Sequence, residues 1–492
     1  MNKEKMKQLS DLQPVAVWKY FHEVTQIPRP SGKEEKIIQY LEAFAAKHHL
    51  SVRKDGAGNV LISKPATPGY ENRPTVILQS HLDMVCEKNN NVVHDFEKDP
   101  IITVVDGDWL RAEGTTLGAD NGIGIAAELA LLASDDVEHG PVECLFTVDE
   151  ETGLTGAAAL EEGFMTGNIL LNLDSEDEGE LFIGCAGGKS TTATFAYEPL
   201  SAPADLHYVR LSVSGLNGGH SGSDIHKGLG NAVKLLARFL FLLKKDFRPV
   251  LAALEGGNLH NAIARESYAV AGLKPEDREA ACVLLNHFAA DVENELKHAD
   301  PGVRLTMETV EAPPTCFGDT LTDRLTDALL ACPHGVMGMS REMEGLVETS
   351  TNLASVKMKE GNRIVVGTSQ RSSIESAKTA VADQVAAVFR LAGAAVEQGE
   401  GYPGWAPDTR SGILQTAQET YRKLFGRDPE VKAIHAGLEC GLFLEKYPHL
   451  DMISFGPTLR DVHSPNERIE IATVDRWWRH LLEVLKNVPS AS

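Results

Sequence analysis

The hydrophobic positions near the start of the chain recur at helical spacing. Between about residues 14 and 48 the apolar side chains lie three or four positions apart, with a break at IPRPSG, where two prolines stop a helix. This pattern predicts two helices joined by a loop. The runs 60–63 and 75–79 that follow are rich in β-branched and aliphatic residues, which is typical of strands.

Helical and strand patterns alternate in the next part of the chain. The spacing predicts a helix over 121–134, a strand over 142–148, a helix over 154–162 and a strand over 169–173. Such alternation is typical of an α/β domain with a mostly parallel sheet flanked by helices.

The pattern changes after GCAGGK. A strand is predicted over 208–215, then a glycine-rich loop, a helix over 231–243 and a strand over 268–272. A comparable order of strand, helix and strand recurs between 303 and 371. We therefore predict an inserted α+β domain built from two similar units.

A second boundary lies at GEGYPGW, where glycine and proline gather. Beyond it a helix over 413–425 and a strand over 451–455 return to the first pattern. The predicted organisation is a discontinuous core domain of residues 1–186 and 401–492, interrupted by a lid or assembly domain of residues 187–400.

Charge and cysteine content narrow the classes of function. The chain carries 47 Lys and Arg against 70 Asp and Glu, and the net charge of −23 disfavours nucleic acid and anionic membranes as partners. Its seven cysteines are scattered and form no CxxC pair, which favours a reducing, cytoplasmic location over a disulfide framework or a thiolate zinc site. Neither a signal peptide nor a membrane span is expected.

Several predicted strands lead directly into side chains that bind metal ions. In open α/β sheets, ligands bind beyond the carboxyl ends of the strands, so we expect four such loops to converge on one crevice. An acidic residue just before the helix of 121–134 is a fifth candidate. The candidate ligands are His81, Asp149, Glu150, Glu151, Asp174 and His463 at the strand ends, and Asp120 before the helix.

Imidazole and carboxylate ligands together favour divalent ions such as zinc. Two such ions about 3.5 to 4 Å apart, bridged by a carboxylate and a water, form a recurring hydrolytic centre. Glu150 and Glu151 are adjacent and point in different directions, so one can bind metal while the other faces the water.

Each residue taken alone also has a structural interpretation. His81 can be a structural histidine at a strand end, Asp120 can be a helix N-cap, and Asp174 can belong to a solvated acidic run. Their common position at strand ends favours a shared site.

Five short motifs carry a resemblance to a known family. The segments HLDMV (81–85), GADNG (118–122), DEETG (149–153), NLD (172–174) and DVHSP (461–465) resemble the motif series of the dinuclear zinc exopeptidases, which include carnosinases and aminoacylases. The resemblance covers essentially the whole chain. It implies hydrolysis of unblocked dipeptides with broad specificity, including Xaa-His dipeptides such as β-alanyl-histidine.

The resemblance also implies a ligand set for two metal ions. His81 and Asp174 would hold one zinc, Glu151 and His463 the other, and Asp120 would bridge both. Cobalt and manganese are alternatives to zinc.

Three neighbouring residues receive roles in the same way. The peptide bond between Asp120 and Asn121 is expected to be cis, as in relatives. Asp83 would orient His81, and Glu150 would be the general base that activates water.

Four further residues are candidates for substrate binding. The loop LNGGHSG resembles the family segment whose histidine reaches the scissile carbonyl, which assigns oxyanion stabilisation to His220. Asn261 and Arg371 would bind the free carboxylate of the substrate, although Arg371 can equally be a surface residue at a strand end. Glu439 lies in HAGLECG, which departs from the family pattern; it either contacts the substrate amine or caps a turn.

Two alternative functions remain at this stage. The same site can serve an N-acyl amino acid deacylase, or the acidic loops can belong to a non-catalytic metal-binding scaffold. The insert can mediate a homodimer, as in relatives, or its two similar units can mimic a second subunit within one chain.

Overall fold

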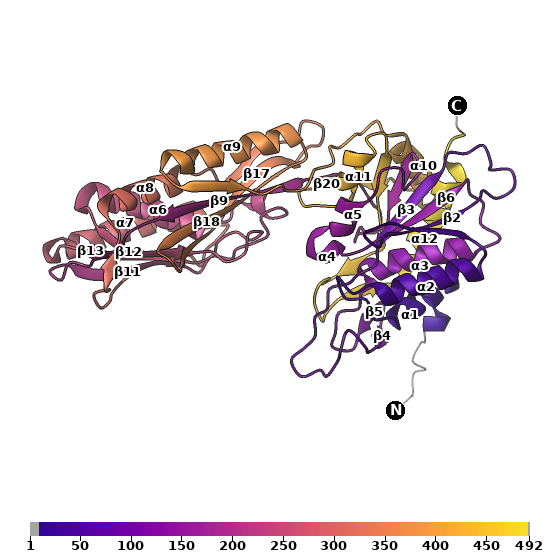
Figure 1. Ribbon diagram of the computed structural model, residues 1–492, viewed down its shortest axis with the longest axis horizontal. Coiled ribbons are helices and arrows are strands. Elements are labelled where there is room, and N and C mark those ends of the chain that lie inside the picture. Colours follow the sequence, from indigo (N-terminus) through magenta and orange to yellow (C-terminus); the bar gives the residue numbers. More distant parts are fainter. Residues whose placement is uncertain (1–8, 491–492) are drawn as a thin grey trace. The chain divides into compact units, whose positions relative to one another are not determined.

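The chain forms two units, each built around one large β-sheet (Figure 1). This computed structural model describes residues 9–490. The first unit takes in the described residues up to 184, residues 407–433 and the described residues from 438 onward; the second takes in 185–406 and 434–437. The predicted α/β fold class is confirmed. The assignment of a catalytic and a lid or dimerisation domain stays a prediction.

The large sheet of the first unit has eight strands, and its four central strands β6, β3, β7 and β21 run parallel. Antiparallel pairs flank them, β1 with β2 and β2 with β6 on one side and β21 with β8 on the other. In spatial order the strands are β1 (Ser51–Lys54), β2 (Val60–Lys64), β6 (Val142–Thr147), β3 (Val76–His81), β7 (Ile169–Asn172), β21 (Asp451–Ser454), β8 (Glu180–Cys185) and β20 (Glu430–Ile434).

Burial along the central strands explains why their apolar residues do not alternate regularly with polar ones. Every residue of β3 and β6 is buried. A strand covered on both faces has no solvent side, so it lacks the alternation of polar and apolar residues that a half-exposed strand shows.

Helices cover this sheet. The two predicted N-terminal helices are α1 (Val15–Thr25) and α2 (Glu35–Lys47), and α1 packs against α3 (Ala119–Ala133), which contacts β3. Near the other end of the chain, α10 (Gly412–Phe425) packs against α12 (Ile471–Asn487) and β21.

The helix predicted over 154–162 is shorter than expected. It is present as α5 (Thr155–Ala159), preceded by α4 (Glu150–Gly153). Leu160 leaves the helical conformation, with φ −53° and ψ 130°, and the carbonyl of Glu161 accepts a hydrogen bond from Phe164 N in a turn. The remaining elements of this unit are η1 (Leu9–Asp11), α11 (Cys440–Lys446) and a small sheet of β22 (Leu459–Arg460), β23 (Arg468–Glu470), β5 (Trp109–Ala112) and β4 (Thr103–Asp106).

The second unit contains a sheet of nine strands with helices on one face (Figure 1). The strands are β14 (Arg304–Thr309), β11 (His207–Ser214), β13 (Ser267–Leu273), β12 (Val250–Gly256), β17 (Val347–Lys359), β18 (Arg363–Ser372), β9 (Gly187–Ala196) and β19 (Ala395–Gln398), with β16 (Gly335–Met339) beside β17. The helices are α6 (Ala232–Phe247), α7 (Arg278–Leu296), α8 (Asp319–Ala331) and α9 (Glu375–Leu391), and shorter elements are β10 (Leu200–Ser201), β15 (Thr315–Cys316), η2 (Ile225–Lys227) and η3 (Pro275–Asp277).

This sheet consists of two halves with the same topology. One half runs β11, α6, β12, β13, α7, β14, and the other runs β9, α8, β17, β18, α9, β19, with the first half inserted after β9. In each half the fourth strand lies beside the first, followed by the third and the second. The second strands of the halves, β12 and β17, meet as an antiparallel pair at Gly256 and Val356. Two similar units are thus present and joined edge to edge, but their bounds differ from the prediction, because β14 belongs to the first half and the second half includes β9.

One hydrophobic core serves both halves. The buried face of α6 contributes Leu236 and Phe239, and α9 contributes Val385 and Phe389 to the same cluster.

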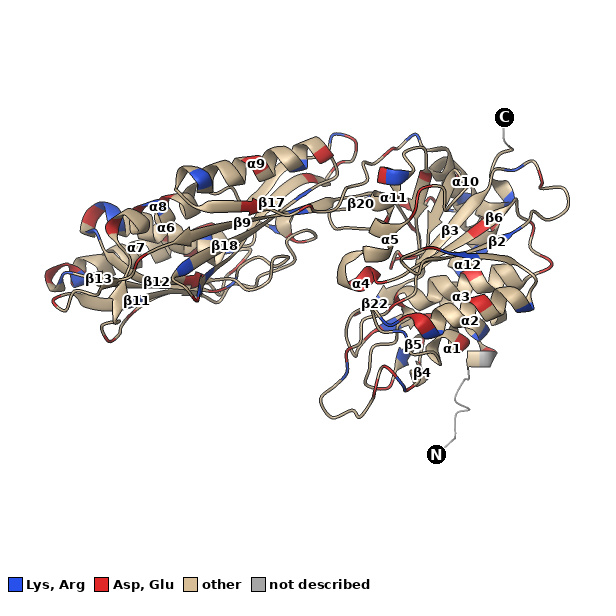
Figure 2. Ribbon diagram, in the orientation of Figure 1, with Lys and Arg blue, Asp and Glu red and all other residues tan. Residues whose placement is uncertain are grey.

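Charged side chains are distributed over helices and loops of both units (Figure 2). Between residues 9 and 490, no helix is both long enough and apolar enough to cross a membrane.

Candidate active site

The predicted metal ligands of the first unit lie at the carboxyl ends of adjacent parallel strands. His81 is the last residue of β3, and Glu150 and Glu151 begin α4 just after β6. Asp174 follows β7 by two residues, and His463 lies in the loop between β22 and β23, nine residues beyond the end of β21. Because these strands are neighbours in the sheet, loops far apart in sequence come together.

Asp120 lies between the two histidines. Its Oδ1 is 3.0 Å from Nε2 of His81, and its Oδ2 is 3.1 Å from Nε2 of His463. The peptide bond from Asp120 to Asn121 is cis, as expected. Each oxygen of one carboxylate therefore faces a different imidazole.

Two more carboxylates complete the arrangement. Asp174 Oδ1 lies 3.4 Å from His81 Nε2, and Glu151 Oε2 lies 3.1 Å from His463 Nε2. This gives two overlapping groups whose ligand atoms lie within 4.8 Å of one another, and both groups include Asp120. Glu150 forms a third group with His81 and Glu151. Asp149, the remaining acidic candidate, lies outside these three groups: it forms a separate carboxylate group with Glu34 and Asp83 and accepts hydrogen bonds from neighbouring threonines.

The residues present suit a divalent metal ion. Imidazole nitrogen and carboxylate oxygen are ligands that zinc accepts, and each group of three ligands leaves room for water or substrate. Glu151 Oε1 is buried and has no hydrogen-bond partner in the structure, although its other oxygen faces His463. A buried carboxylate oxygen without a partner is costly unless it binds a cation.

The electrostatics of the cluster point in the same direction. Hydrogen bonds to Asp120 and Glu151 raise the pKa of His463 to about 11. Burial alone would raise the pKa of Asp120, but the two facing histidines lower it well below its usual range. The carboxylates thus stabilise positive charge strongly, as a cation site requires.

Asp83 connects two of the loops that carry the ligands. Its Oδ1 lies 3.3 Å from Nδ1 of His81, and its two oxygens accept hydrogen bonds from the backbone N–H groups of Glu150 and Glu151 at 3.0 and 3.2 Å. Ser31 donates a further hydrogen bond. Burial opposes ionisation of Asp83, but His81 and these donors hold its pKa below the usual value.

Asp120, Asp174 and Glu151 each lie within ion-pair distance of His81 or His463, whereas Glu150 forms no such pair. Burial raises its pKa well above the usual range, and the charges of Asp174, Glu439 and Glu151 raise it further, whereas His81 lowers it. A carboxyl group that holds a proton readily is suited to proton transfer.

Glu439 lies in the same unit and is 1% exposed. Its Oε2 accepts hydrogen bonds from Gln79 Nε2 at 2.6 Å and Thr147 Oγ1 at 2.9 Å, whereas its Oε1 has no hydrogen-bond partner in the structure. Burial raises the pKa of Glu439 to about 7. Glu439 is therefore a fixed side chain with one oxygen still able to bind a partner.

His220 lies in the second unit, and its hydrogen bonds indicate which ring nitrogen carries the proton. Nδ1 faces the backbone N–H groups of Gly222 and Ser223 at 3.3 and 3.1 Å, so it must accept. Burial, together with the charge of Arg371, lowers the pKa of His220, which favours the neutral ring. A neutral histidine that accepts at Nδ1 carries its proton on Nε2.

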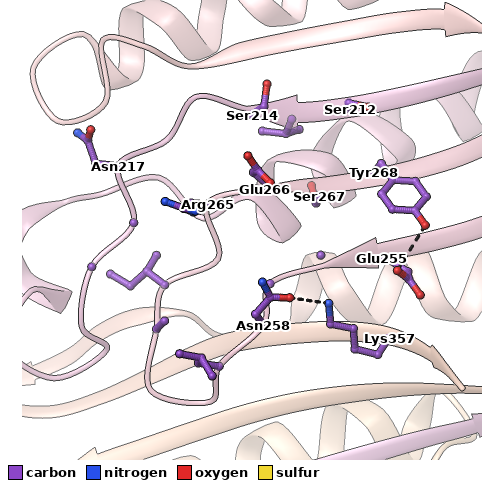
Figure 3. Close-up of a pocket in the computed structure, with 18 of the residues that line it drawn as sticks. Ser212, Ser214, Asn217, Glu255, Asn258, Arg265, Glu266, Ser267, Tyr268 and Lys357 are labelled. Carbon is purple, nitrogen blue, oxygen red and sulfur yellow. Dashed lines mark hydrogen bonds between the residues drawn. The ribbon is translucent and has the colours of Figure 1, made fainter. Parts of the chain in front are cut away.

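His220 and Asn261 line a cavity of about 830 Å³ in the second unit. Their two loops are held together by hydrogen bonds from Ser221 N to Asn261 O and from Ile263 N to Gly219 O. Within the cavity wall, Lys357 donates a hydrogen bond to Asn258 and Tyr268 donates one to Glu255 (Figure 3).

Arg371 is on β18 in the same unit and is buried rather than exposed at a strand end. Its Nη1 donates a hydrogen bond of 3.1 Å to the hydroxyl of Tyr402, and its Nε is buried without a partner in the structure. The charges of Arg371 and His220 help burial to lower the pKa of His435 to about 4. A buried guanidinium with a free N–H group is available to an anion.

Several residues around these sites were not identified from the sequence. Tyr402 and His435 flank Arg371, and Arg29 and Glu467 are buried charged residues beside the metal-ligand loops. Arg29 lies in the IPRPSG segment, which was interpreted only as a loop between helices, and Glu467 follows His463 by four positions. Proximity in sequence to a predicted ligand was the one available signal for Glu467.

The fold of the first unit thus brings two imidazoles and four carboxylates together. One of these carboxylates, Glu150, is the candidate general base. This fold and site define a metal-dependent hydrolase. Residues 77–487 match the sequence pattern of Peptidase family M20/M25/M40, and the chain belongs to this family. The predicted family and the predicted peptide-hydrolase class are confirmed.

Individual relatives are similar over their full length. The chain is 42% identical over 485 residues to the cytosol non-specific dipeptidase of Escherichia coli K12, covering 99% of this chain and 100% of that protein. The crystal structure of aminoacylhistidine dipeptidase from Vibrio alginolyticus superposes with a TM-score of 0.93 at 44% identity and 99% coverage of each chain. A tripeptidase from Staphylococcus aureus shares the fold, with a TM-score of 0.56, 17% identity and coverage of 97% of this chain and 99% of that one.

Proposed function

We propose that this chain is a dinuclear metallo-dipeptidase that hydrolyses unblocked dipeptides with broad specificity, including Xaa-His dipeptides such as β-alanyl-histidine. The observation that carries the proposal is Asp120, whose two carboxylate oxygens face His81 and His463. The names of the Escherichia coli and Vibrio alginolyticus relatives support dipeptides as the substrate.

The two ions would share the ligands of the two groups. His81 and Asp174 would hold one, Glu151 and His463 the other, and Asp120 both. Zinc suits these ligands, with cobalt and manganese as alternatives. When bound, such ions lower the pKa of a water molecule and polarise the scissile carbonyl.

The protein groups carry the proton and orient the ligands. Glu150 accepts a proton from the attacking water and donates it to the leaving amine. Asp83 orients His81 through its contact with Nδ1, which leaves Nε2 directed at Asp120 and Asp174.

Three of the four proposed substrate-binding residues lie in the second unit. His220 would donate a hydrogen bond from its Nε2–H group to the developing oxyanion, and Asn261 and Arg371 would bind the substrate carboxylate. Glu439 would accept a hydrogen bond from the substrate amine through its free Oε1. In this proposal residues 187–400 form the lid, and residues 1–186 and 401–492 form the catalytic domain.

Location and assembly complete the proposal. The name of the Escherichia coli relative supports a cytoplasmic enzyme. The lid domain would also mediate a homodimer. In the alternative proposal the two halves of the lid in one chain take the place of a dimer, and the edge-to-edge pairing of β12 with β17 supports that alternative.

A substrate panel tests this function against a deacylase. Zinc-loaded protein is offered dipeptides, the same dipeptides with a C-terminal amide, and N-acyl amino acids. We expect hydrolysis of free dipeptides and a large loss with the amides, because the amide removes the charge that Arg371 binds. Preference for the N-acyl amino acids would establish the deacylase instead, and equal rates for dipeptides and amides would contradict the carboxylate-binding role.

A further inference from the structure

Two buried charged residues hold the backbone on either side of the predicted metal ligands. Arg29 and Glu467 are each 2% exposed and belong to the first unit. Neither is among the candidate ligands. Burying a charge is costly unless hydrogen bonds or an opposite charge compensate it, so the partners of these two side chains identify what they do.

Glu467 binds the segment that ends in Asp120. Its Oε2 accepts hydrogen bonds from the N–H groups of Leu117 and Gly118 at 2.7 and 2.9 Å, and its Oε1 accepts from Ala119 and Asp120 at 2.8 and 3.3 Å. One carboxylate thus satisfies four successive backbone donors. Burial raises the pKa of Glu467, and the hydrogen bonds from these backbone donors oppose that rise.

Glu467 is also fixed to the loop that carries His463. Its backbone N–H donates to the carbonyl of Ser464 at 3.0 Å, one residue beyond His463. The same residue therefore connects the chain on either side of the 3.1 Å contact between Asp120 and His463.

Arg29 connects Asp120 to the other histidine. Nη1 donates to the carbonyls of Leu82 and Asp83 at 2.9 and 2.6 Å, directly after His81, and Nη2 donates to the carbonyl of Gly118. The guanidinium therefore joins the loop after β3 to the turn before α3. Its planar arrangement of N–H donors allows one side chain to bind three carbonyls.

Gly118 lies between the two charged groups. Its N–H donates to Glu467 and its carbonyl accepts from Arg29. Gly118 has φ of +68°, and a Cβ atom there would lie 2.7 Å from both Arg29 Nη2 and Met84 Sδ. The absence of a side chain permits this close approach, which leaves the turn little freedom to shift.

We propose that Arg29 and Glu467 are positioning residues that fix the carboxylate of Asp120 between His81 and His463, so that one carboxylate can bind two metal ions. This inference rests on the bridging role of Asp120 in the proposed function. Neither residue belongs to the proposed metal ligands or to the proposed substrate-binding residues. Residues of this kind around metal ligands typically change metal affinity by about 10- to 100-fold when substituted.

The test compares two buried glutamates that differ in what they hold. In Glu467→Gln the amide replaces a negative acceptor with one neutral acceptor and one donor, which faces backbone N–H groups. The matched control is Glu143→Gln, because Glu143 is also buried in the first unit and accepts hydrogen bonds from Thr166 N and Gly167 N, away from the predicted ligands. Metal-free forms of both variants are titrated with Zn²⁺ against a chelating indicator, and their unfolding by urea is measured in parallel.

We expect Glu467→Gln to weaken zinc affinity by about 10- to 100-fold, whereas Glu143→Gln retains parental affinity although its urea midpoint falls to a similar extent. If Glu467→Gln does not fold, Arg29→Lys is measured in the same zinc titration. Lysine keeps the positive charge, but its single ammonium group cannot bind all three carbonyls that the planar guanidinium binds. Weaker zinc binding is therefore expected again. Unchanged zinc affinity in the folded variant, or equal weakening in Glu143→Gln, would overturn the positioning role. Parental zinc affinity in Asp120→Asn would instead refute the bridging role on which the inference rests.

Discussion

Asp120 presents its two oxygens to different imidazoles at 3.0 and 3.1 Å, and its neighbours determine that placement. Asp83 holds the start of α4 and lies beside His81. Glu467 accepts hydrogen bonds from the backbone up to Asp120 itself. At the scale of single residues, the site is therefore a set of side chains whose loops are tied to one another through backbone hydrogen bonds.

The general-base role of Glu150 is tested by Glu150→Gln. The amide keeps the size of the side chain but cannot take up a proton, and Glu150 is not among the five proposed ligands. We expect parental metal content and a decrease in kcat by about 10²- to 10⁴-fold. Metal analysis and steady-state kinetics on the same preparation measure both.

The control for this change is Glu162→Gln, an exposed carboxylate of the same unit, which should leave both quantities unaltered. Near-parental turnover by a fully metal-loaded Glu150→Gln protein would remove Glu150 from the base role.

The residues of the site differ in how far the sequence could predict them. The ligand motifs stand at the ends of strands, so a strand pattern followed by a histidine or carboxylate was sufficient to locate them. Arg29 binds backbone carbonyls, and every residue offers a carbonyl, so its partners depend on the tertiary fold alone. Tyr402 similarly reaches Arg371 across 31 positions of the chain.

At the scale of helices and strands, periodicity predicted the elements that have a strong apolar pattern. The N-terminal helices, α3, α6 and α10 lie where the spacing of apolar residues places them. The helix over 154–162 ended early because Leu160 adopts an extended backbone, which apolar spacing does not encode. The alternation of helices and strands predicted a mostly parallel sheet, and the four central strands are parallel. The flanking strands are antiparallel, because their direction depends on pairing between distant segments.

The contact between α10 and α12 contains a titratable group with a predictable effect. Nε2 of His480 on α12 lies 2.8 Å from the carbonyl oxygen of Ala417. Because a carbonyl can only accept a hydrogen bond, Nε2 carries the proton and donates. Burial lowers the pKa of His480 from 6.5 to about 4. Between these values the unfolded chain binds more protons than the folded protein, so the free energy of unfolding falls as pH falls through this range.

Above about pH 6.5 His480 is neutral in both the folded and the unfolded chain, and its burial costs no deprotonation. By pH 4 the free energy of unfolding has fallen on this account by on the order of 2 to 3 kcal/mol. His480→Gln removes the titrating group, so its free energy of unfolding should decline less steeply than that of the parent between pH 6.5 and 4. Urea unfolding followed by tryptophan fluorescence at several pH values measures this slope. The exposed His449→Gln variant should keep the parental slope, and a parental slope in His480→Gln would contradict the account.

At the scale of the whole molecule, the two sheets divide the proposed tasks. The first unit contains all the predicted metal ligands, and the second unit contains His220, Asn261 and Arg371. The sequence indicated two similar units in the insert but not their edge-to-edge pairing. That pairing rests on hydrogen bonds between β12 and β17, which are about a hundred residues apart and carry no matching sequence signal.

The central claim is that Asp120 bridges two metal ions, and anomalous X-ray scattering from crystals of the zinc-loaded protein tests it most directly. The account predicts two zinc peaks about 3.5 to 4 Å apart, with one oxygen of Asp120 on each, His81 and Asp174 on the first, and Glu151 and His463 on the second. A single zinc peak, or two peaks that do not share Asp120, would contradict it.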